Sequence, residues 1–302
     1  MPLFAGADVG GTKTSVLLAE DDRELARATA AGAAVRPGRA LVSSSRIASA
    51  VRSVLAQAGK LEADVLVVGA AGAGREPARS ELREGLRIEH VAGRVVVTGD
   101  VDIALEAAFG EGPGIVVVSG TGSIVVGRRT DGSLTRAGGL GWQMGDEGSG
   151  YAIGRAALQA VGRADEGRGP ATTLSERLLA IARVDDFDGL VGWSTTAQPG
   201  ELAAFAAAVA EAAESGDQVA GGILADAASA LESLVASVSG RWTGEPAMIP
   251  VALTGGGLAQ DRPLGRRLAS LLDATGRYAL RTAPLDPAEG ALRIARRIGP
   301  TR

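Results

Sequence analysis

The sequence predicts an α/β protein whose two halves are built on one plan. Short apolar runs alternate with segments of helical periodicity along most of the 302 residues, and glycine-rich turns follow several of these runs. The stretch ADVGGTKTSVLLAEDD at 7–22 returns in type as VVSGTGSIVVGRRTDG at 117–132. Each reads as an apolar strand, a glycine-threonine turn, a β-branched strand and an acidic turn. We therefore expect the same supersecondary unit in both halves.

The first half begins with this hairpin and continues with alternating helices and strands. Apolar residues from Ile47 to Ala58 recur at helical spacing and predict one buried helix face. DVLVVGAAGAG, from Asp64, reads as a buried strand ending in a glycine turn. A helix over 77–86, a strand over 94–100 and a helix over 101–109 complete the half.

The second half repeats the plan with longer helices. Its hairpin over 112–134 precedes alanine-rich helical patterns at 201–214 and 219–239. IPVALTGGG at 249–257 predicts a strand ending in a glycine cluster, and two more helices are expected at 261–274 and 286–298. No low-complexity linker separates the halves, so we place the hinge at 100–114.

Composition removes several classes of function. A net charge of −4, with scattered Lys and Arg, gives no footprint for nucleic acid. No apolar run approaches the roughly 18 residues of a membrane span, and no signal peptide is evident, so we expect a cytoplasmic protein without a membrane partner. The absence of cysteine excludes thiol nucleophiles and iron-sulfur clusters. His90, the only histidine, is interpreted as structural, so a general base should be a carboxylate.

The glycine turns carry the candidate chemistry. Asp8 stands in an apolar strand just before Gly10 and Gly11, where an uncompensated carboxylate costs several kcal/mol. A dinucleotide fingerprint needs a helix after the glycines, and a Walker A loop needs Gly-Lys-Ser/Thr, whereas here a strand-like run follows Thr12-Lys13. A hairpin whose backbone N–H groups approach an anion remains. The second hairpin could grip a polyphosphate from the other side, and Gly255–Gly257 is expected at a strand end where a helix begins.

The order Asp-x-Gly-Gly-Thr, Ser-Gly-Thr-Gly-Ser, Thr-Gly-Gly-Gly resembles the superfamily of sugar kinases, heat-shock ATPases and actin. AGGLGWQMGDEGSGYAIGRAAL at 137–158 and PLDPAEGALRIA at 284–295 resemble the BadF/BadG-type ATPase family and its N-acetylglucosamine kinase branch. The resemblance implies two RNase H-like domains, 1–105 plus 286–302 and 106–285, with ATP and Mg²⁺ in a cleft that closes around a sugar. It also implies a homodimer.

Carried over by position, the resemblance assigns roles to individual residues. Asp8 matches the metal-associated aspartate, Asp100 the general base and Asp146 the acid that holds sugar hydroxyls. Asp100 also ends a predicted strand, where active sites gather, although a helix N-cap is the alternative and Asp102 is the rival acid. Asp146 and Glu147 could instead form a polar turn before a helix. The remaining matches are Gly10, Gly11, Thr12 and Lys13 in the first phosphate loop, Gly120, Thr121 and Gly122 in the second, Gly255 and Gly256 on the adenosine side, and Gly139 with Glu147 on the sugar side.

The expected reaction is transfer of the γ-phosphoryl of ATP to the 6-hydroxyl of an amino sugar, N-acetylglucosamine or glucosamine. Two departures leave the sugar open: Val35 and Arg36 replace the usual asparagine, and Leu140 stands where tryptophan is usual, with Trp142 following. Arg36 could favour an acidic, muramic-type sugar. A non-catalytic nucleotide-binding protein of the actin type is the alternative from another class. The cysteine-ligated cluster of the dehydratase activators is absent, and no basic helix-turn-helix precedes Asp8.

Overall fold

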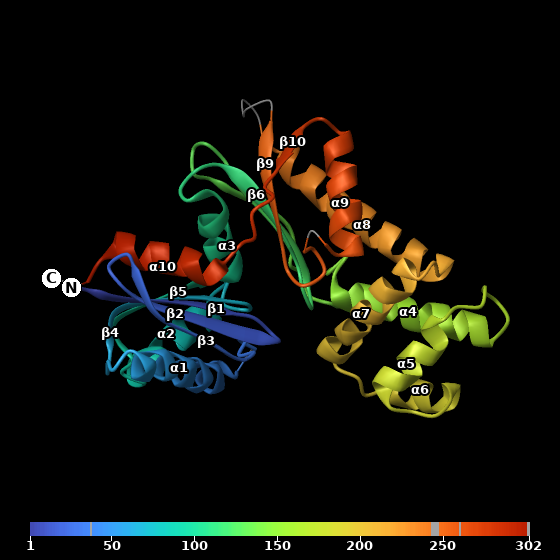
Figure 1. The fold of residues 1–302 in the computed structure, drawn as a ribbon, viewed down its shortest axis with the longest axis horizontal. Coiled ribbons are helices and arrows are strands. Elements are labelled where there is room, and N and C mark those ends of the chain that lie inside the picture. Colours follow the sequence, from blue (N-terminus) through green and yellow to red (C-terminus); the bar gives the residue numbers. More distant parts are fainter. Residues whose placement is uncertain (37, 243–247, 260, 301–302) are drawn as a thin grey trace. The chain divides into compact units, whose positions relative to one another are not determined.

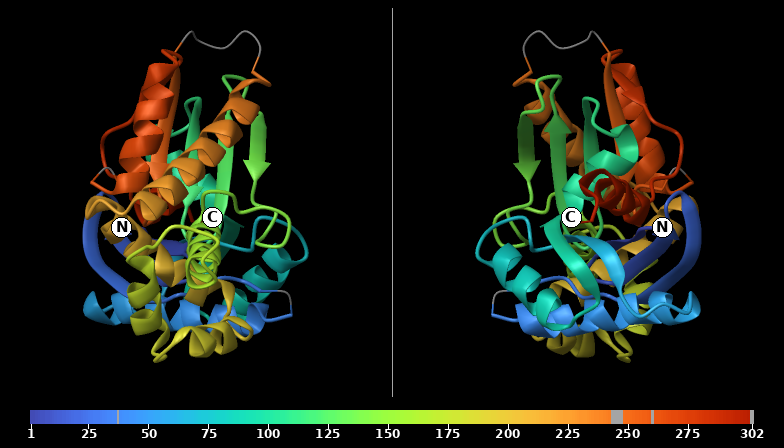
Figure 2. Two further views of the ribbon diagram at one scale, coloured as in Figure 1. Left: turned by 90° about the vertical axis from the view of Figure 1, so that its right-hand side faces the viewer. Right: turned by 90° about the vertical axis from the view of Figure 1, so that its left-hand side faces the viewer.

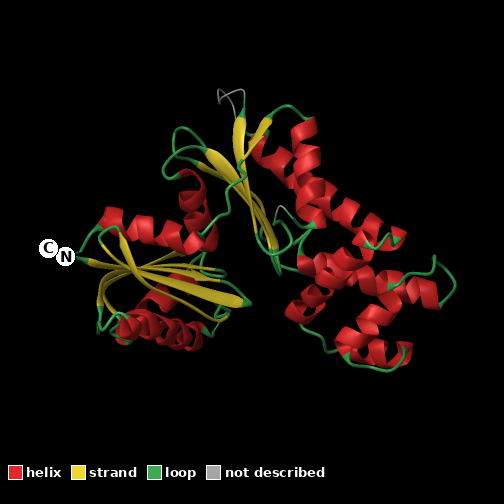
Figure 3. Ribbon diagram, in the orientation of Figure 1, coloured by secondary structure: helices red, strands yellow, loops and turns green. Residues whose placement is uncertain are grey.

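The computed structural model describes residues 1–36, 38–242, 248–259 and 261–300; the last two residues of the predicted first domain, 301–302, lie outside them. It is an α/β protein with two five-stranded sheets, as predicted (Figures 1 and 3). Contacts within the chain divide it into two compact units, Met1–Glu111 with Leu285–Arg302, and Gly112–Pro284. Each unit contains one sheet.

The first sheet has the strand order β3-β2-β1-β4-β5. β1 pairs antiparallel with β2, and β2 with β3, whereas β1–β4 and β4–β5 are parallel. The predicted hairpin is therefore confirmed. The edge strand β3 was not predicted, because its sequence RELARATAA mixes charged residues with alanines and only Ala26 is buried. The strands are β1 (Leu3–Val9), β2 (Lys13–Glu20), β3 (Arg23–Ala31), β4 (Ala63–Ala70) and β5 (Ala92–Gly99).

Helices cover both faces of the first sheet. α1 (Ala40–Gln57) and α2 (Ala78–Ile88) lie on one face, and α3 (Asp100–Phe109) and α10 (Pro287–Ile298) on the other (Figure 1). α10 approaches β1 so closely that a Cβ on Gly6 would stand 2.4 Å from the carbonyl oxygen of Ala288. α10 also packs against α3 (Figure 2). The last helix therefore completes the core around the first strand.

The second sheet has the order β10-β9-β6-β7-β8, which read from β8 reproduces the order of the first. Here too an antiparallel hairpin, β6–β7, is followed by an antiparallel third strand, and β9 and β10 are parallel neighbours on the other side. The predicted repeat is confirmed. The short outer strands β8 and β10 were not predicted. The strands are β6 (Gly114–Ser119), β7 (Ser123–Arg128), β8 (Leu134–Gly138), β9 (Ile249–Thr254) and β10 (Tyr278–Leu280).

The second unit carries most of the helices. Their buried apolar residues form one core with Ile115, Val117 and Val251 of the sheet. α8 is long and apolar enough to cross a membrane by length and composition, but Leu224, Leu231 and other apolar residues of it pack in this core. α5 and α6 are short and partly polar, which explains why periodicity did not predict them. The helices are α4 (Gly150–Asp165), α5 (Leu174–Ala182), α6 (Phe187–Ser194), α7 (Pro199–Glu214), α8 (Gln218–Ser239) and α9 (Pro263–Ala274).

Candidate functional site

The first hairpin closes as a tight glycine turn. The N–H of Gly10 donates to the carbonyl of Lys13 at 2.9 Å, leaving Gly11 and Thr12 at an exposed tip. The carbonyl of Gly10 accepts from the N–H groups of Ala33 and Ala34, at 3.1 and 3.2 Å. Glycine is required at position 32, because a Cβ there would stand 2.1 Å from the carbonyl oxygen of Gly11. Backbone contacts alone thus hold this turn in place.

Asp8 lies beside the hairpin on the sheet face that α3 and α10 cover, opposite Ser15 on β2. Its carboxylate takes no hydrogen bond from any of the described residues. Burial and the negative charge of Asp100 raise the pKa of Asp8 from 3.8 to about 6, with Asp286 adding to this and Lys13 opposing it. Lys13 therefore stabilises the charge of this carboxylate only in part, and no hydrogen-bond donor of the described residues adds to it.

Asp100 is placed differently from the prediction. It is the first residue of α3, and neither the last residue of β5 nor the N-cap, which is Gly99. Asp102 caps the helix by accepting from the N–H of Gly99 at 3.0 Å and from the Thr98 hydroxyl. Asp102 is the third residue of α3, the position from which a side chain closes a capping box by accepting from the N-cap N–H. This rival acid therefore has a structural role.

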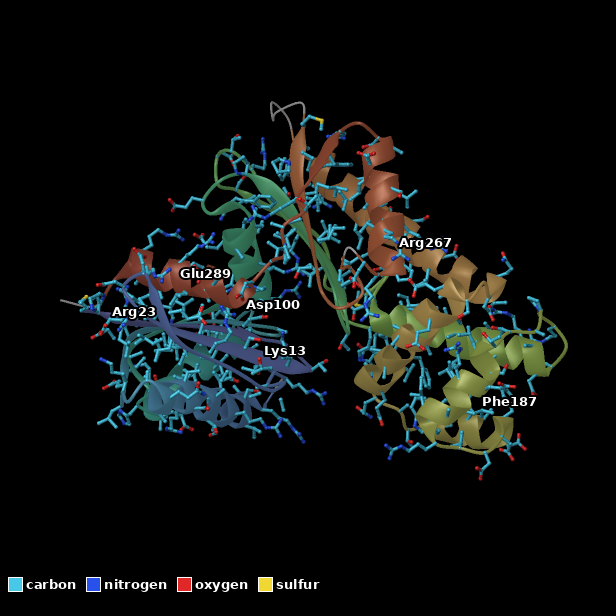
Figure 4. All side chains as sticks on the ribbon, viewed as in Figure 1. Lys13, Arg23, Asp100, Phe187, Arg267 and Glu289 are labelled. Carbon is cyan, nitrogen blue, oxygen red and sulfur yellow. The ribbon has the colours of Figure 1, made fainter. Side chains whose placement is uncertain are left out.

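This arrangement leaves Asp100 available for chemistry. Its Oδ1 accepts from the N–H of Val101 at 3.0 Å, and burial raises its pKa despite this bond, with Asp102 adding to the rise. In the sheet, Val9 is in register with Ala70, and Ala70 with Gly99, so Asp8 and Asp100 lie near the same edge. Figure 4 labels Asp100 and Lys13 at this end of the first unit.

The second hairpin reproduces the first. The N–H of Gly120 donates to the carbonyl of Gly122 at 2.9 Å across Thr121, and the turn is at least partly exposed. The N–H groups of Gly150 and Tyr151, in the first turn of α4, donate to the carbonyls of Gly120 and Thr121 at 2.8 and 3.3 Å. The start of α4 therefore packs directly on this turn.

Three predicted sugar-side residues meet at one buried residue, Ser123. Gly139 donates its N–H to the Ser123 carbonyl at 2.9 Å, and the Ser123 hydroxyl donates to the Glu147 carbonyl at 2.7 Å. Oδ1 of Asp146 accepts from the Ser123 N–H at 3.2 Å. Burial raises the pKa of Asp146, the Ser123 N–H lowers it and Glu147 raises it. Sequence reasoning missed Ser123, although it ends the quoted Ser-Gly-Thr-Gly-Ser motif.

The third glycine cluster differs in one respect from the prediction. Gly255 and Gly256 follow β9 directly, but α9 begins only at Pro263, so the cluster does not open a helix N-terminus. Gly255 has φ +106, and a Cβ there would stand 2.0 Å from the Ser119 carbonyl oxygen. It thus packs against the end of β6, beside the second hairpin, while Gly256 is open to solvent.

The two departures from the usual sugar motif lie in different units. In the first unit, Val35 is buried and donates its N–H to the Ala71 carbonyl at 2.8 Å, whereas the Arg36 side chain is exposed. In the second, Leu140 and Trp142 are exposed, and the Trp142 ring lies 5.7 Å from that of Tyr151. His90 is an exposed left-handed residue after α2, in keeping with its structural interpretation.

A divalent cation fits the first unit's chemistry. Within the described ranges, no three acidic or histidine side chains gather to form a complete protein cage. Mg²⁺ prefers another arrangement, with one or two carboxylates completed by waters and substrate phosphates. Asp8, partly buried, without a hydrogen-bond donor and close to the glycine turn, suits that arrangement.

Two glycine hairpins on two sheets of the same topology define an ATPase of the actin and sugar-kinase class. The model of the BadF/BadG/BcrA/BcrD ATPase family matches residues 5–295. This chain belongs to that family.

Curated relatives and solved structures agree with this assignment. The chain is 28% identical to the N-acetyl-D-glucosamine kinase of Dictyostelium discoideum, with 97% of both chains aligned. It is 34% identical to the N-acetylmuramic acid/N-acetylglucosamine kinase of Clostridium acetobutylicum, although that match spans only 55% of either chain. A crystal structure from Chromobacterium violaceum, assigned as an N-acetylglucosamine kinase, has a TM-score of 0.79 at 28% identity over 97% of this chain and 98% of that one. A hexokinase from Thermus thermophilus shares the fold, with a TM-score of 0.57 at 20% identity, over 97% of each chain.

Proposed function

We propose that this protein is an ATP-dependent kinase that phosphorylates an amino sugar, N-acetylglucosamine or glucosamine, at its 6-hydroxyl. The observation that carries the proposal is the pair of carboxylates at one edge of the first sheet. Asp8 is partly buried and receives no hydrogen bond from the described residues, and Asp100 has a raised pKa at the start of α3. The Asp8 carboxylate is suited to binding a cation, and the Asp100 carboxylate is suited to accepting a proton. The family match and the named relatives support the same activity.

Asp100 acts as the general base. Burial shifts the pKa of Asp100 upward, in the direction of the working pH, and a general base is most effective when its pKa lies near that pH. The Val101 N–H fixes one carboxylate oxygen, so the other can receive the hydroxyl proton of the sugar. Because phosphoryl transfer passes through a loose transition state, the base is needed late and positioning dominates.

The nucleotide phosphates are held by the two hairpins. In the first unit, Gly10 closes the turn, and Gly11, Thr12 and Lys13 supply backbone donors and one positive charge. In the second, Gly120, Thr121 and Gly122 supply a matching turn, and Gly255 and Gly256 border the adenosine. Asp8 would hold Mg²⁺, which neutralises charge on the β- and γ-phosphates when bound. Asp146, with Gly139 and Glu147, orients the sugar through its hydroxyls.

An acidic amino sugar is the second candidate substrate. Arg36 is exposed on a loop that Val35 anchors, and none of the described residues forms an ion pair with its guanidinium. A free guanidinium can bind a carboxylate through two parallel N–H···O hydrogen bonds. The partial match to the N-acetylmuramic acid/N-acetylglucosamine kinase supports this candidate. We further propose that the two units are the two RNase H-like domains, and that the protein is a cytoplasmic homodimer.

A panel of sugars tests the proposal. Glucosamine, N-acetylglucosamine, N-acetylmuramic acid and glucose are each incubated with Mg²⁺ and ATP, and ADP release and phosphosugar mass are measured. We expect an amino sugar to raise ADP release well above the basal rate, with phosphorus NMR placing the new ester on the 6-oxygen. If no sugar raises ADP release, the actin-type binding protein is the better description.

Arg36→Ala separates the two candidate substrates. If the guanidinium binds a sugar carboxylate, the variant should lose about tenfold in kcat/KM for N-acetylmuramic acid, from one lost charge-assisted pair. The same variant should keep its rate on N-acetylglucosamine, which has no carboxylate. Equal losses on both sugars would contradict this role for Arg36.

A further inference from the structure

The second phosphate hairpin needs support from outside its own turn. Its tip has three residues, two of them glycines, and one internal hydrogen bond between Gly120 and Gly122. Glycine adopts many backbone conformations, so such a turn does not by itself fix the direction of its N–H groups. An anion site works only when its donors are held in place beforehand.

The carboxylate of Asp146 lies directly against this turn. A Cβ on Gly122 would stand 2.9 and 3.0 Å from the two carboxylate oxygens of Asp146 and 3.1 Å from its carbon. The same carboxylate accepts from the Ser123 N–H at 3.2 Å, so it is bonded to the residue that follows the tip. Asp146 therefore contacts the turn by packing and by a hydrogen bond.

The backbone at Asp146 is arranged for this contact. Asp146 has φ +65, a left-handed conformation that few residues other than glycine, asparagine and aspartate adopt. Its carbonyl accepts from Ser149 N–H at 3.1 Å, at the N-cap of α4. Since Ser149 also caps α4 through its side chain, a helix end holds the Asp146 backbone in place.

We propose that Asp146 is a positioning residue for the second phosphate hairpin, so that the protein's nucleotide affinity depends on this carboxylate even when no sugar is bound. The inference rests on the proposed function, which assigns the hairpin to phosphate. With Oδ1 engaged by Ser123, Oδ2 remains free to accept a sugar hydroxyl. One carboxylate then touches both substrates, and binding of either one pre-orders the site for the other.

The experiment measures Mg²⁺·ADP binding by calorimetry in the absence of any sugar. Asp146→Gly removes the carboxylate without straining the backbone, because φ is already positive. Asp146→Asn removes the charge but keeps the size and an oxygen that accepts the Ser123 N–H. We expect the glycine variant to bind about tenfold more weakly, the worth of one lost hydrogen bond to a charged group, and the asparagine variant to stay within about threefold of wild type.

Asp131→Ala is the matched control. Asp131 also braces a turn in the second unit, accepting from the N–H and hydroxyl of Ser133 at 2.8 and 2.5 Å, but that turn joins β7 to β8. Its loss should leave Mg²⁺·ADP affinity unchanged. Wild-type affinity in Asp146→Gly, or equal weakening in the glycine and asparagine variants, would overturn the positioning role. Failure of the wild type to bind Mg²⁺·ADP would overturn the proposed function together with it.

Thermal unfolding of each variant checks that it folds. Should Asp146→Gly not fold, Gly122→Ala displaces the carboxylate from the other side, since its new methyl group would stand within 3.1 Å of it. Weakening of about tenfold then supports the proposal, by the same lost hydrogen bond, and unchanged affinity contradicts it.

Discussion

Asp8 in the first unit and Asp217 in the second are both partly buried aspartates, yet their surroundings differ completely. Asp217 caps α8 through the N–H of Ala220 and also accepts from the N–H of Thr173 and the hydroxyls of Thr172 and Thr173. Burial raises its pKa, but these four bonds outweigh it and lower the pKa to about 2. Asp8 has no such donor and its pKa rises to about 6. The contrast indicates that a structural carboxylate receives hydrogen bonds from the protein at both of its oxygens, whereas a carboxylate that binds a ligand is left without protein donors.

The largest effect is expected at Asp100, another acid whose pKa is raised. Asp100→Asn keeps the shape but cannot accept the proton, so kcat should fall by about 10² to 10⁴. The Kd for Mg²⁺·ADP should stay within about threefold, because the residue does not hold phosphate. Single-turnover phosphotransfer and calorimetry measure the two quantities. Near wild-type turnover in the variant would remove Asp100 as the base and reopen the case for Asp102.

Asp8→Asn should have opposite effects on activity and stability. The Mg²⁺ concentration for half-maximal activity should rise at least about tenfold, because an anionic ligand is lost. Without metal, the variant should be more stable by about 2 kcal/mol at pH 7, since a buried uncompensated charge is removed. Metal titrations of activity and urea unfolding in chelator measure these changes. A variant less stable than wild type would mean that an unrecognised partner compensates Asp8.

The stability gain from Asp8→Asn should depend on pH. Between the ordinary pKa of 3.8 and about 6, the folded protein keeps a proton that the unfolded chain has released. The free energy of unfolding of the wild type therefore falls as pH rises through this window. The gain from Asn should be full above about pH 6 and absent below about pH 4. A gain independent of pH would show that it does not arise from ionisation.

The smallest effect is expected for Asp217→Ala, and its effect on stability is opposite in sign to that of Asp8→Asn. Loss of the cap should destabilise the protein by about 1 kcal/mol at pH 7, a value kept low because the side chain is partly exposed. Since the folded pKa is depressed, this contribution exists above about pH 4 and is lost as pH falls toward 2. Urea unfolding at two pH values measures it. Stabilisation by the alanine would reverse the contrast with Asp8.

Local patterns predicted the parts of the fold that depend on neighbours in sequence. Both hairpins, their repetition and the helices at 201–214 and 286–298 follow from periodicity and turn residues. The outer strands β3, β8 and β10 escaped prediction because an exposed edge strand needs little apolar patterning. At Thr98–Asp102, sequence alone could not decide which of two aspartates closes the capping box.

The residues proposed for the site were recognisable in the sequence, but the contacts among them were not. Asp8 was recognisable because a carboxylate in an apolar strand is conspicuous. The junction at Ser123 joins residues more than a dozen positions apart in the chain, and no local pattern reports such contacts. The Gly-Asp-Glu-Gly-Ser stretch, whose acids we propose for the sugar side, therefore also contacts the second hairpin at Ser123, and the sequence analysis had treated the two as separate.

The return of α10 to the first sheet has a consequence for protein synthesis. β1 leaves the ribosome before the other strands and helices, but the core on one of its faces is completed only by Leu292 and its neighbours, after residues 112–284 have been made. The usual order, in which N-terminal segments fold first, should therefore be reversed here. The second unit can finish folding while the nascent first unit still exposes Phe4 and Leu17, which is the interval in which a chaperone would find its binding site.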